Sequence, residues 1–394
     1  MRQLRRGAVT VLLIVPYVIS QEAWAENEAE ASTAGNKVVE LPAVSVTATR
    51  TEREIDLTSK PVTIITREQI EARNARTVVE LLADVPGVSF SRAGGLVGQA
   101  VVHGFNTNDP RALLSIESDR FRGRNTLEYT LLDPNQIERI EVIRGPASTL
   151  YGPDALAGVI NIITRRAQGD PTGAFGLKVR LRALNFNRVN DLYGGRAGLE
   201  GLSNGVDLLL GINGRTANDY ESPEGTISNS DFETLSTDLR LGYTPILDHC
   251  LELTTKYAEV AAGDAGGITG RPRVPLLRVC RDPTREHFIK LGYTGEDLGL
   301  GLEQIQASVY ARELFTNIPS ENRTIPNRLT ELENIVDGPL VIGGKLLGTL
   351  PWGDNLLTMG TDFFHEDRKG TESSRRVTNI CISLCHRALD RGEP

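Results

Sequence analysis

The chain has 394 residues, a formal net charge of −8 at pH 7 and only 5% aromatic residues. This length is more than one average domain needs, and the acidic charge argues against nucleic acid as a partner. No stretch of about 18 uninterrupted apolar residues occurs, so helical membrane spans are not expected.

Residues 1–25 have the pattern of a cleaved signal peptide. Three arginines precede an apolar run at residues 8–19, and Ala23-Trp24-Ala25 offers a small-x-small cleavage site. The apolar run is shorter than the roughly 20 residues that a helical span requires. We therefore expect export, with cleavage after Ala25.

Residues 26–50 are predicted to form a mobile N-terminal segment. Residues 26–36 are small and acidic and lack aromatic or large aliphatic side chains, which is typical of disorder. Residues 38–50, VVELPAVSVTATR, are β-prone and could add as an extra strand to the sheet of a partner. Any mobile β-rich tail would show the same pattern.

Residues 51–166 alternate short strand and helix signals. A strand at 61–66 is followed by a helix for which Thr66 and Gln69 form a capping box. Thr77 is placed to cap a second helix that ends before Pro86-Gly87, and further strands are expected at 88–90 and 100–102. The region is predicted to fold as a small α+β domain.

Residues 131–165 contain two strongly β-branched strand patterns. The first lies at 137–143, where apolar residues are interleaved with Glu and Arg, and indicates a half-buried strand. The second lies at 159–163. The turn region between them carries Gly145, Pro146, Gly152, Pro153 and Gly158, and several of its backbone positions are expected to need φ values that only Gly tolerates.

From Phe175 onward, apolar and polar residues alternate with period two, which fits strands with one apolar and one wet face. A soluble sheet with one solvated face would give the same pattern. The gaps between strands alternate short and long, as in outer-membrane barrels with tight periplasmic turns and long outer loops. Candidate strands lie at residues 191–199, 206–215, 234–243, 250–259, 285–294, 302–312, 339–347 and 356–365, with a last one at 375–385.

The stretch at 131–165 closely resembles the plug domain of TonB-dependent outer-membrane receptors. The resemblance rests on IERIEVIRGP at 137–146, LYG at 150–152, ALAGVINIIT at 155–164 and the VTATR-like segment near the N-terminus. It implies a membrane β fold, with an N-terminal α+β plug domain at 51–166 followed by a partial antiparallel transmembrane β-barrel at 175–394. One departure is Val102-His103-Gly104-Phe105, where the family usually has Ile-Arg-Gly-Phe.

The resemblance also implies partners. The segment at 26–50 would hold the TonB box, at Ala43, Val44, Ser45, Val46 and Thr47. The partners would be TonB with its inner-membrane energising complex, and the lipid of the outer membrane of a Gram-negative bacterium. Receptors of this family have about 22 barrel strands, whereas only nine or ten are expected here, so we interpret the chain as C-terminally truncated.

The transported ligand is expected to be an iron carrier. Residues 327–370 look most like the haem and haemoglobin receptor branch, and a ferric siderophore is the alternative. No intrinsic cofactor is implied. Candidate ligand-binding residues are Arg120, Arg122, Arg124 and Tyr129, with Tyr129 as a possible haem ligand. The arginines could equally be a solvated charge run, and Tyr129 a packed aromatic residue. His103 is expected in the plug core rather than at the ligand surface.

No enzymatic activity is expected, because the sequence shows no nucleophile–base constellation and no phosphate-binding loop. Cys250 and Cys280 could pair after export. Cys381, Cys385 and His386 are too few ligands for a convincing metal site, so none is assigned. A secreted soluble β-rich protein remains the alternative from a different class.

Overall fold

The computed structural model describes residues 45–46, 53–54 and 61–377. The described residues exclude short segments at 74, 76, 93–94, 107–111, 117–118, 121–128, 152–154, 168–175, 188–189, 224, 247–248, 270–273, 299–300, 326–327 and 353–354. The predicted signal peptide and acidic lead-in lie outside the described residues. Residues 44–394 form one compact unit.

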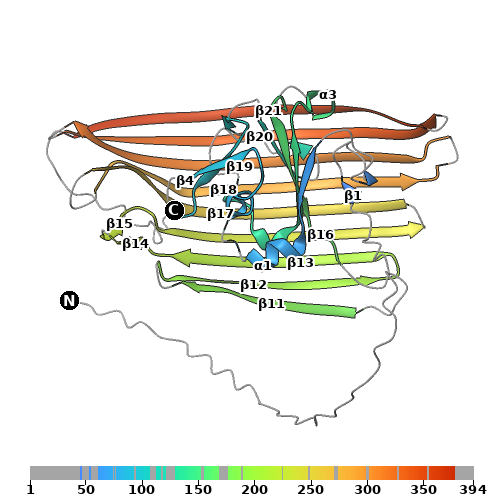
Figure 1. Ribbon diagram of the computed structural model, residues 1–394, viewed down its shortest axis with the longest axis horizontal. Coiled ribbons are helices and arrows are strands. Elements are labelled where there is room, and N and C mark those ends of the chain that lie inside the picture. Colours follow the sequence, from blue (N-terminus) through green and yellow to red (C-terminus); the bar gives the residue numbers. More distant parts are fainter. Residues whose placement is uncertain are drawn as a thin grey trace, which may run out of the picture. The chain divides into compact units, whose positions relative to one another are not determined.

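The N-terminal domain, from β3 to β10, is built on a five-stranded mixed sheet (Figure 1). β7 and β10 run parallel, whereas the other neighbours are antiparallel. The predicted strands at 137–143 and 159–163 are two of its three interior members. The strand order is β3 (Val62–Ile65), β9 (Ile137–Arg144), β10 (Gly158–Thr164), β7 (Ala112–Ile116) and β8 (Asp119–Arg120).

β9 is more deeply buried than the sequence predicted. Ile137, Ile140 and Val142 are fully enclosed, but so is Glu141, which the alternation had placed on a wet face. Glu141 accepts a 2.8 Å hydrogen bond from Nε of Arg139. A buried carboxylate needs such a partner, because an unpaired charge in the core would cost several kcal/mol.

Both predicted helix caps are confirmed. The amide of Thr66 donates to Oε1 of Gln69 at 3.1 Å, and the amide of Gln69 donates back to Oγ1 of Thr66, closing the capping box of α1 (Arg67–Arg73). Thr77 caps α2 (Val78–Leu81) through the amide of Glu80. A third short helix, α3 (Ser148–Tyr151), lies in the turn region between β9 and β10.

A three-stranded sheet completes this domain, with β4 (Val88–Arg92), β5 (Gly98–Val102) and β6 (Phe105–Asn106). His103 lies in the tight turn between β5 and β6 with a φ of 47°. The side chain is exposed, so the expectation of a core position is wrong. The ring lies on the surface beside Gly87, and its Nδ1 is 3.1 Å from the carbonyl oxygen of Ala157.

The second half of the described chain is a nine-stranded antiparallel sheet whose strands pair in chain order, apart from the inserted hairpin β14–β15 (Figure 1). The order is β11 (Gly176–Asn187), β12 (Leu192–Ser203), β13 (Val206–Ala217), β16 (Phe232–Ile246), β17 (His249–Thr269), β18 (Val274–Glu296), β19 (Gln304–Ile325), β20 (Arg328–Trp352) and β21 (Asn355–Val377). Two small pairs are β14 (Tyr220–Ser222) with β15 (Gly225–Ile227), and β1 (Ser45–Val46) with β2 (Arg53–Glu54).

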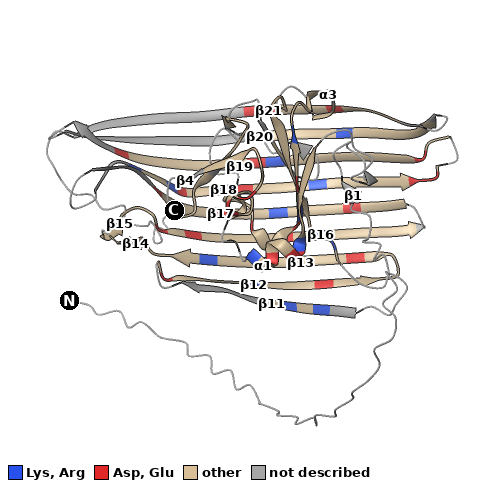
Figure 2. Cartoon of the chain, viewed as in Figure 1, with Lys and Arg blue, Asp and Glu red and all other residues tan. Residues whose placement is uncertain are grey.

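The expected alternation of faces is present. One face of the large sheet, here called the outer face, exposes large apolar side chains such as Ile212 (50%), Ile289 (50%) and Val309 (54%). The opposite, inner face buries polar and charged side chains, among them Arg196 and Glu286. Charged residues recur along the strands of the sheet (Figure 2). Most of those that are buried lie on the inner face, while a few exposed ones, such as Arg285 with Glu259, lie on the outer face.

Three sequence-based expectations for the large sheet need correction. The expected long loops at 260–284 and 313–338 are mostly strand, because β17 pairs with β18 and β19 with β20 far beyond the predicted ends. The strand expected at 375–385 is not separate, since residues 375–377 belong to β21 and the rest lie outside the described residues.

Cys250 and Cys280 are free thiols, so the suggested disulfide is wrong. Cys250 lies opposite Thr294, whereas Cys280 lies opposite Gly263, thirteen residues farther along β17. At about 3.3 Å per residue the two positions are roughly 40 Å apart, far beyond disulfide reach.

None of the described helices has the length and apolarity that a helical membrane span requires.

Candidate functional site

The inner face of the large sheet meets the N-terminal domain through apolar residues such as Leu192 and Phe232, which share its buried cluster, and through a set of polar contacts. Nε2 of Gln136, in the 3-10 turn η2 (Pro134–Gln136), donates to Oδ1 of Asp238 on β16 at 2.8 Å. Nη1 of Arg240, also on β16, donates to Oγ1 of Thr164 at the end of β10 at 3.3 Å. We call this set of contacts the docking interface. Because it is polar, water can replace its contacts at a lower cost than it could in an apolar interface.

A second part of the docking interface lies where the chain leaves β10. Nη2 of Arg165 is 3.3 Å from Oε2 of Glu200 on β12, and Nε of Arg180 on β11 is 2.8 Å from the same oxygen. The side chain of Glu200 is only 3% exposed, and that of Arg165 11%. One buried carboxylate therefore joins two strands of the sheet to the N-terminal domain.

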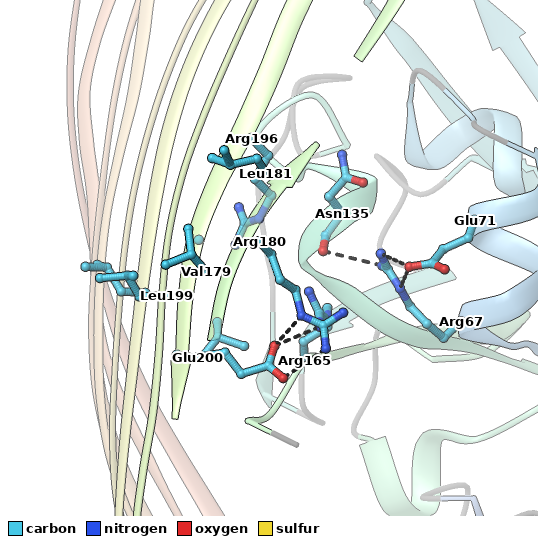
Figure 3. Close-up of a pocket in the computed structure, with 13 residues that line it drawn as sticks. Arg67, Glu71, Asn135, Arg165, Val179, Arg180, Leu181, Arg196, Leu199 and Glu200 are labelled. Carbon is cyan, nitrogen blue, oxygen red and sulfur yellow. Dashed lines mark hydrogen bonds and ion pairs between the residues drawn. The ribbon is translucent and has the colours of Figure 1, made fainter. Parts of the chain in front are cut away.

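These side chains border a cavity of about 410 Å³ between the N-terminal domain and strands β11 to β13. Figure 3 shows Arg180 and Arg165 converging on Glu200, while Val179 and Leu199 point away from them. The polar wall of the cavity comprises Arg67, Glu71, Asn135, Arg165, Arg196 and Glu200, with Arg180 at its edge.

Arg67 fixes the wall of this cavity on the side of the N-terminal domain. Its Nη1 donates to the carbonyl oxygens of Pro134, Asn135 and Ile137, at 3.3, 3.4 and 2.7 Å, so it holds η2 in place. Its Nε and Nη2 engage Glu71, one turn along α1. The position of η2, and with it that of Gln136, is therefore set by a side chain from the first helix.

The inner face also carries a buried charge network away from the docking interface. Glu286 on β18 accepts from Nε of Arg312 on β19 at 2.7 Å and from Nζ of Lys256 on β17 at 3.4 Å. All three side chains are at least nine-tenths buried. The network ties three neighbouring strands together beneath the apolar outer face.

Few of the predicted site residues can be placed. Of the predicted TonB box, Ser45 and Val46 form β1, which pairs with Glu54 and Arg53, while Ala43, Val44 and Thr47 lie outside the described residues. The backbone of Arg120 is part of β8, but its side chain is not described. Arg122 and Arg124 also lie outside the described residues.

Tyr129 is placed in the hydrophobic core of the N-terminal domain, with 2% of its surface exposed. A side chain in that position is enclosed by protein and has no room for a bulky ligand. This environment fits the alternative that Tyr129 is a packed aromatic residue. The position of Tyr129 does not support a role as a haem ligand.

Sequence reasoning did not single out the residues of the docking interface. The alternation of strand residues could have found part of them, because it places Glu200 and Asp238 on the wet face. It gives no pairing between segments that are far apart in sequence. Among the described residues, no group of three or more His, Cys, Asp or Glu side chains is placed to hold a metal ion.

Comparison with known proteins finds likenesses that are centred on the N-terminal domain. Residues 54–159 match the family described as the TonB-dependent Receptor Plug Domain. The chain is also 29% identical over 356 residues to the iron-regulated outer membrane virulence protein of Vibrio cholerae, a match that covers 86% of this chain and 50% of the relative. These matches support a TonB-dependent receptor.

Two further likenesses agree with this reading of the plug. The chain is 36% identical over 128 residues to the vitamin B12 transporter BtuB of Vibrio vulnificus, covering 32% of this chain and 21% of the relative. The structure of the ferric citrate transporter FecA in its unliganded form shares the fold, with a TM-score of 0.63 and 18% identity over 83% of this chain and 50% of that chain. The chain thus spans about half the length of the first curated relatives that it matches.

Proposed function

We propose that this chain acts in the outer membrane of a Gram-negative bacterium as part of a TonB-dependent receptor that takes up an iron carrier. The observation that carries the proposal is the docking interface, in which a plug domain is held by polar contacts such as Gln136–Asp238. The sheet that holds it exposes apolar side chains on its other face. This arrangement suits a removable gate inside a wall that faces lipid.

The docking interface explains how such a gate could move. Its contacts are hydrogen bonds and ion pairs, whose net worth is small when water can replace them. A pull on the N-terminal segment would break these polar contacts at low cost, whereas the sheet residues that share a buried apolar cluster with the plug core, such as Leu192 and Phe232, would become exposed as the plug moves. The segment around β1 would receive that pull by adding as a strand to the sheet of TonB.

The ligand is proposed to be an iron carrier because the Vibrio cholerae relative is named for iron regulation. Haem is the first candidate, on the resemblance of residues 327–370 to the haem receptor branch, and a ferric siderophore is the second. The BtuB likeness adds cobalamin as a third. That match covers 32% of this chain. A non-catalytic role agrees with the names of these relatives, which are transporters or outer-membrane proteins.

The proposal is tested by fractionation and by iron-dependent growth. The protein should sediment with the outer membrane, and cells that depend on it should grow on haem or on one ferric siderophore as the sole iron source. Growth should be lost in cells without TonB. It should also be lost with Val46→Pro, which removes a backbone N–H from the pairing segment, but not with the control Ala34→Pro upstream. Growth that persists without TonB would overturn the proposal.

A further inference from the structure

The cavity beside the docking interface contains more guanidinium donors than its carboxylates use. Arg165 and Arg180 both bind Glu200, at 3.3 and 2.8 Å from its Oε2. Glu138 comes no closer than 3.9 Å to Nε of Arg165. Two cations thus share one closely bound carboxylate, and a guanidinium offers five N–H donors in a fork that matches oxyanions.

One of these donors is buried without an acceptor. Among the described residues, Nε of Arg165 has no hydrogen-bond partner although it is shielded from solvent. Burial lowers the pKa of Arg165, and the nearby guanidiniums of Arg67 and Arg180 lower it further. The carboxylate oxygen that faces it, Oε2 of Glu138, is likewise buried without a hydrogen bond and lies 3.9 Å away, too far to satisfy Nε, so an acceptor that comes closer would be favoured.

Arg67 does not change this balance. It is a cation, so it cannot accept from Nε of Arg165, and it does not bind a ligand directly. Its donors are already engaged by three backbone carbonyls and by Glu71. It therefore contributes positive charge to the wall of the cavity rather than free N–H groups. The two groups that could bind a ligand directly are Arg165, which is held in the plug, and Arg180, which is half-exposed on β11 at the mouth of the cavity.

We propose that this cavity binds a small oxyanion, a carboxylate or a phosphate, between Arg165 of the plug and Arg180 of the wall. The volume of about 410 Å³ exceeds what one such ion needs and lies within the range of ligand pockets. The bound anion would accept bidentate, charge-assisted hydrogen bonds from the two guanidiniums. The inference does not depend on which ligand is transported, or on transport itself.

Such a site would link anion binding to plug docking. The anion and Glu200 would compete for the same two arginines, because Glu200 now occupies the donors that face it. Occupancy would therefore weaken the contact between β12 and the plug. By reciprocity, loss of the Glu200 charge should strengthen anion binding.

The test is isothermal titration calorimetry on the full chain in detergent micelles, with citrate in one arm and inorganic phosphate in the other. We expect saturable binding of at least one anion. Arg180→Gln, at a half-exposed position that tolerates change, should weaken it about tenfold or more, the size of one charge-assisted hydrogen bond. Glu200→Gln should tighten it. Arg285→Gln, which removes an arginine on the outer face bound to Glu259, should leave it unchanged.

Binding of citrate alone would identify a carboxylate site, and binding of phosphate alone a phosphate site. The proposal is overturned if neither anion binds saturably, or if Arg180→Gln and Arg285→Gln bind equally well. It is also overturned if Glu200→Gln binds more weakly while circular dichroism shows the same fold. Because the readout is binding to purified protein, a failure here leaves the uptake proposal standing, and a failure of uptake leaves this one standing.

Discussion

Gln136 and Asp238 are 102 residues apart in the chain, yet Nε2 of the first donates to Oδ1 of the second at 2.8 Å. The same carboxylate is paired with Arg196 on β12, also at 2.8 Å. One aspartate on β16 therefore holds the plug and at the same time links β16 to β12 of the large sheet. The position of the plug therefore depends on how the charged side chains of the inner face are paired with one another.

Gln136→Ala is expected to loosen the plug without unfolding it. A hydrogen bond to a charged group contributes about 1.5–3 kcal/mol, and Asp238 keeps Arg196 as a partner when the glutamine is lost. Hydrogen exchange at the amides of η2 and of Arg165 should become roughly ten- to a hundredfold faster. Exchange resolved by peptide mass spectrometry measures this.

The matched control is Gln304→Ala. That glutamine donates to Glu296 at 2.9 Å in an exposed hairpin of the large sheet and is not part of the docking interface. Equal exchange rates at η2 in both variants would show that the Gln136–Asp238 bond does not position the plug.

Glu286→Ala should be far more destabilising than Glu259→Ala, although each removes one glutamate from an ion pair. Loss of Glu286 leaves Lys256 and Arg312 buried without their shared counter-charge, which costs about 3–5 kcal/mol. Glu259 and its partner Arg285 are 34% and 47% exposed, so that pair contributes about 0–1 kcal/mol. Urea unfolding of the full chain in micelles should therefore show a large shift of the midpoint only for Glu286→Ala. Similar shifts would mean that the network is solvated.

Local patterns in the sequence predicted most of the fold. The capping box at Thr66 and the strand at 137–143 depend on neighbouring residues and were found where expected. The ends of the long hairpins were missed because residues 260–284 contain Gly and Pro that indicate loops, while strand pairing is a tertiary effect. The bulge near Asp282-Pro283 lets β18 continue past a proline.

The candidate site was less accessible from the sequence. Alternation along β12 and β16 places Glu200 and Asp238 on the wet face, but it cannot say that one meets Arg165 and the other Gln136. Burial was misjudged for His103 and left open for Tyr129, since a single aromatic or His residue carries no period from which its face can be read.

Thr66→Ala should destabilise the start of α1 by about 1 kcal/mol, because it removes the hydroxyl that accepts from Gln69. That hydroxyl also lowers the pKa of Glu68 from its ordinary value of 4.5. A depressed carboxyl pKa stabilises the fold above the ordinary value and loses this effect as the pH falls through the shifted one. The protection factor of the Ile70 amide, which donates to the Thr66 carbonyl, should therefore fall in acid in the wild type, when exchange is compared with the intrinsic rate at the same pH. The acid-dependent part should shrink in Thr66→Ala, which removes the largest cause of the lowered pKa, and should persist in full in Thr77→Ala, which uncaps α2 instead.

Asn229 ties the β14–β15 hairpin segment to the extended end of β17 and β18. Its Nδ2 donates to the carbonyl oxygens of Asp264 and Val279, at 2.9 and 3.0 Å, and its Oδ1 lies 3.1 Å from Sγ of Cys280. Its φ of 64° lies in the left-handed region. Glycine adopts that conformation without strain, so Asn229→Gly removes the side-chain bonds while leaving the backbone geometry available.

Asn229→Gly should expose Cys280, which is 8% exposed in the wild type. Hydrogen bonds worth about 1 kcal/mol each would raise the open fraction roughly ten- to a hundredfold. The readout is the alkylation rate of Cys280 by peptide-resolved mass spectrometry, with Cys250 in the same chain as the internal reference. Asn204→Gly makes the same change at another positive φ, 49°, in the tight turn between β12 and β13, and should leave the rate unaltered. If both variants alkylate Cys280 at the wild-type rate, the hairpin segment is held by contacts other than those of the Asn229 side chain.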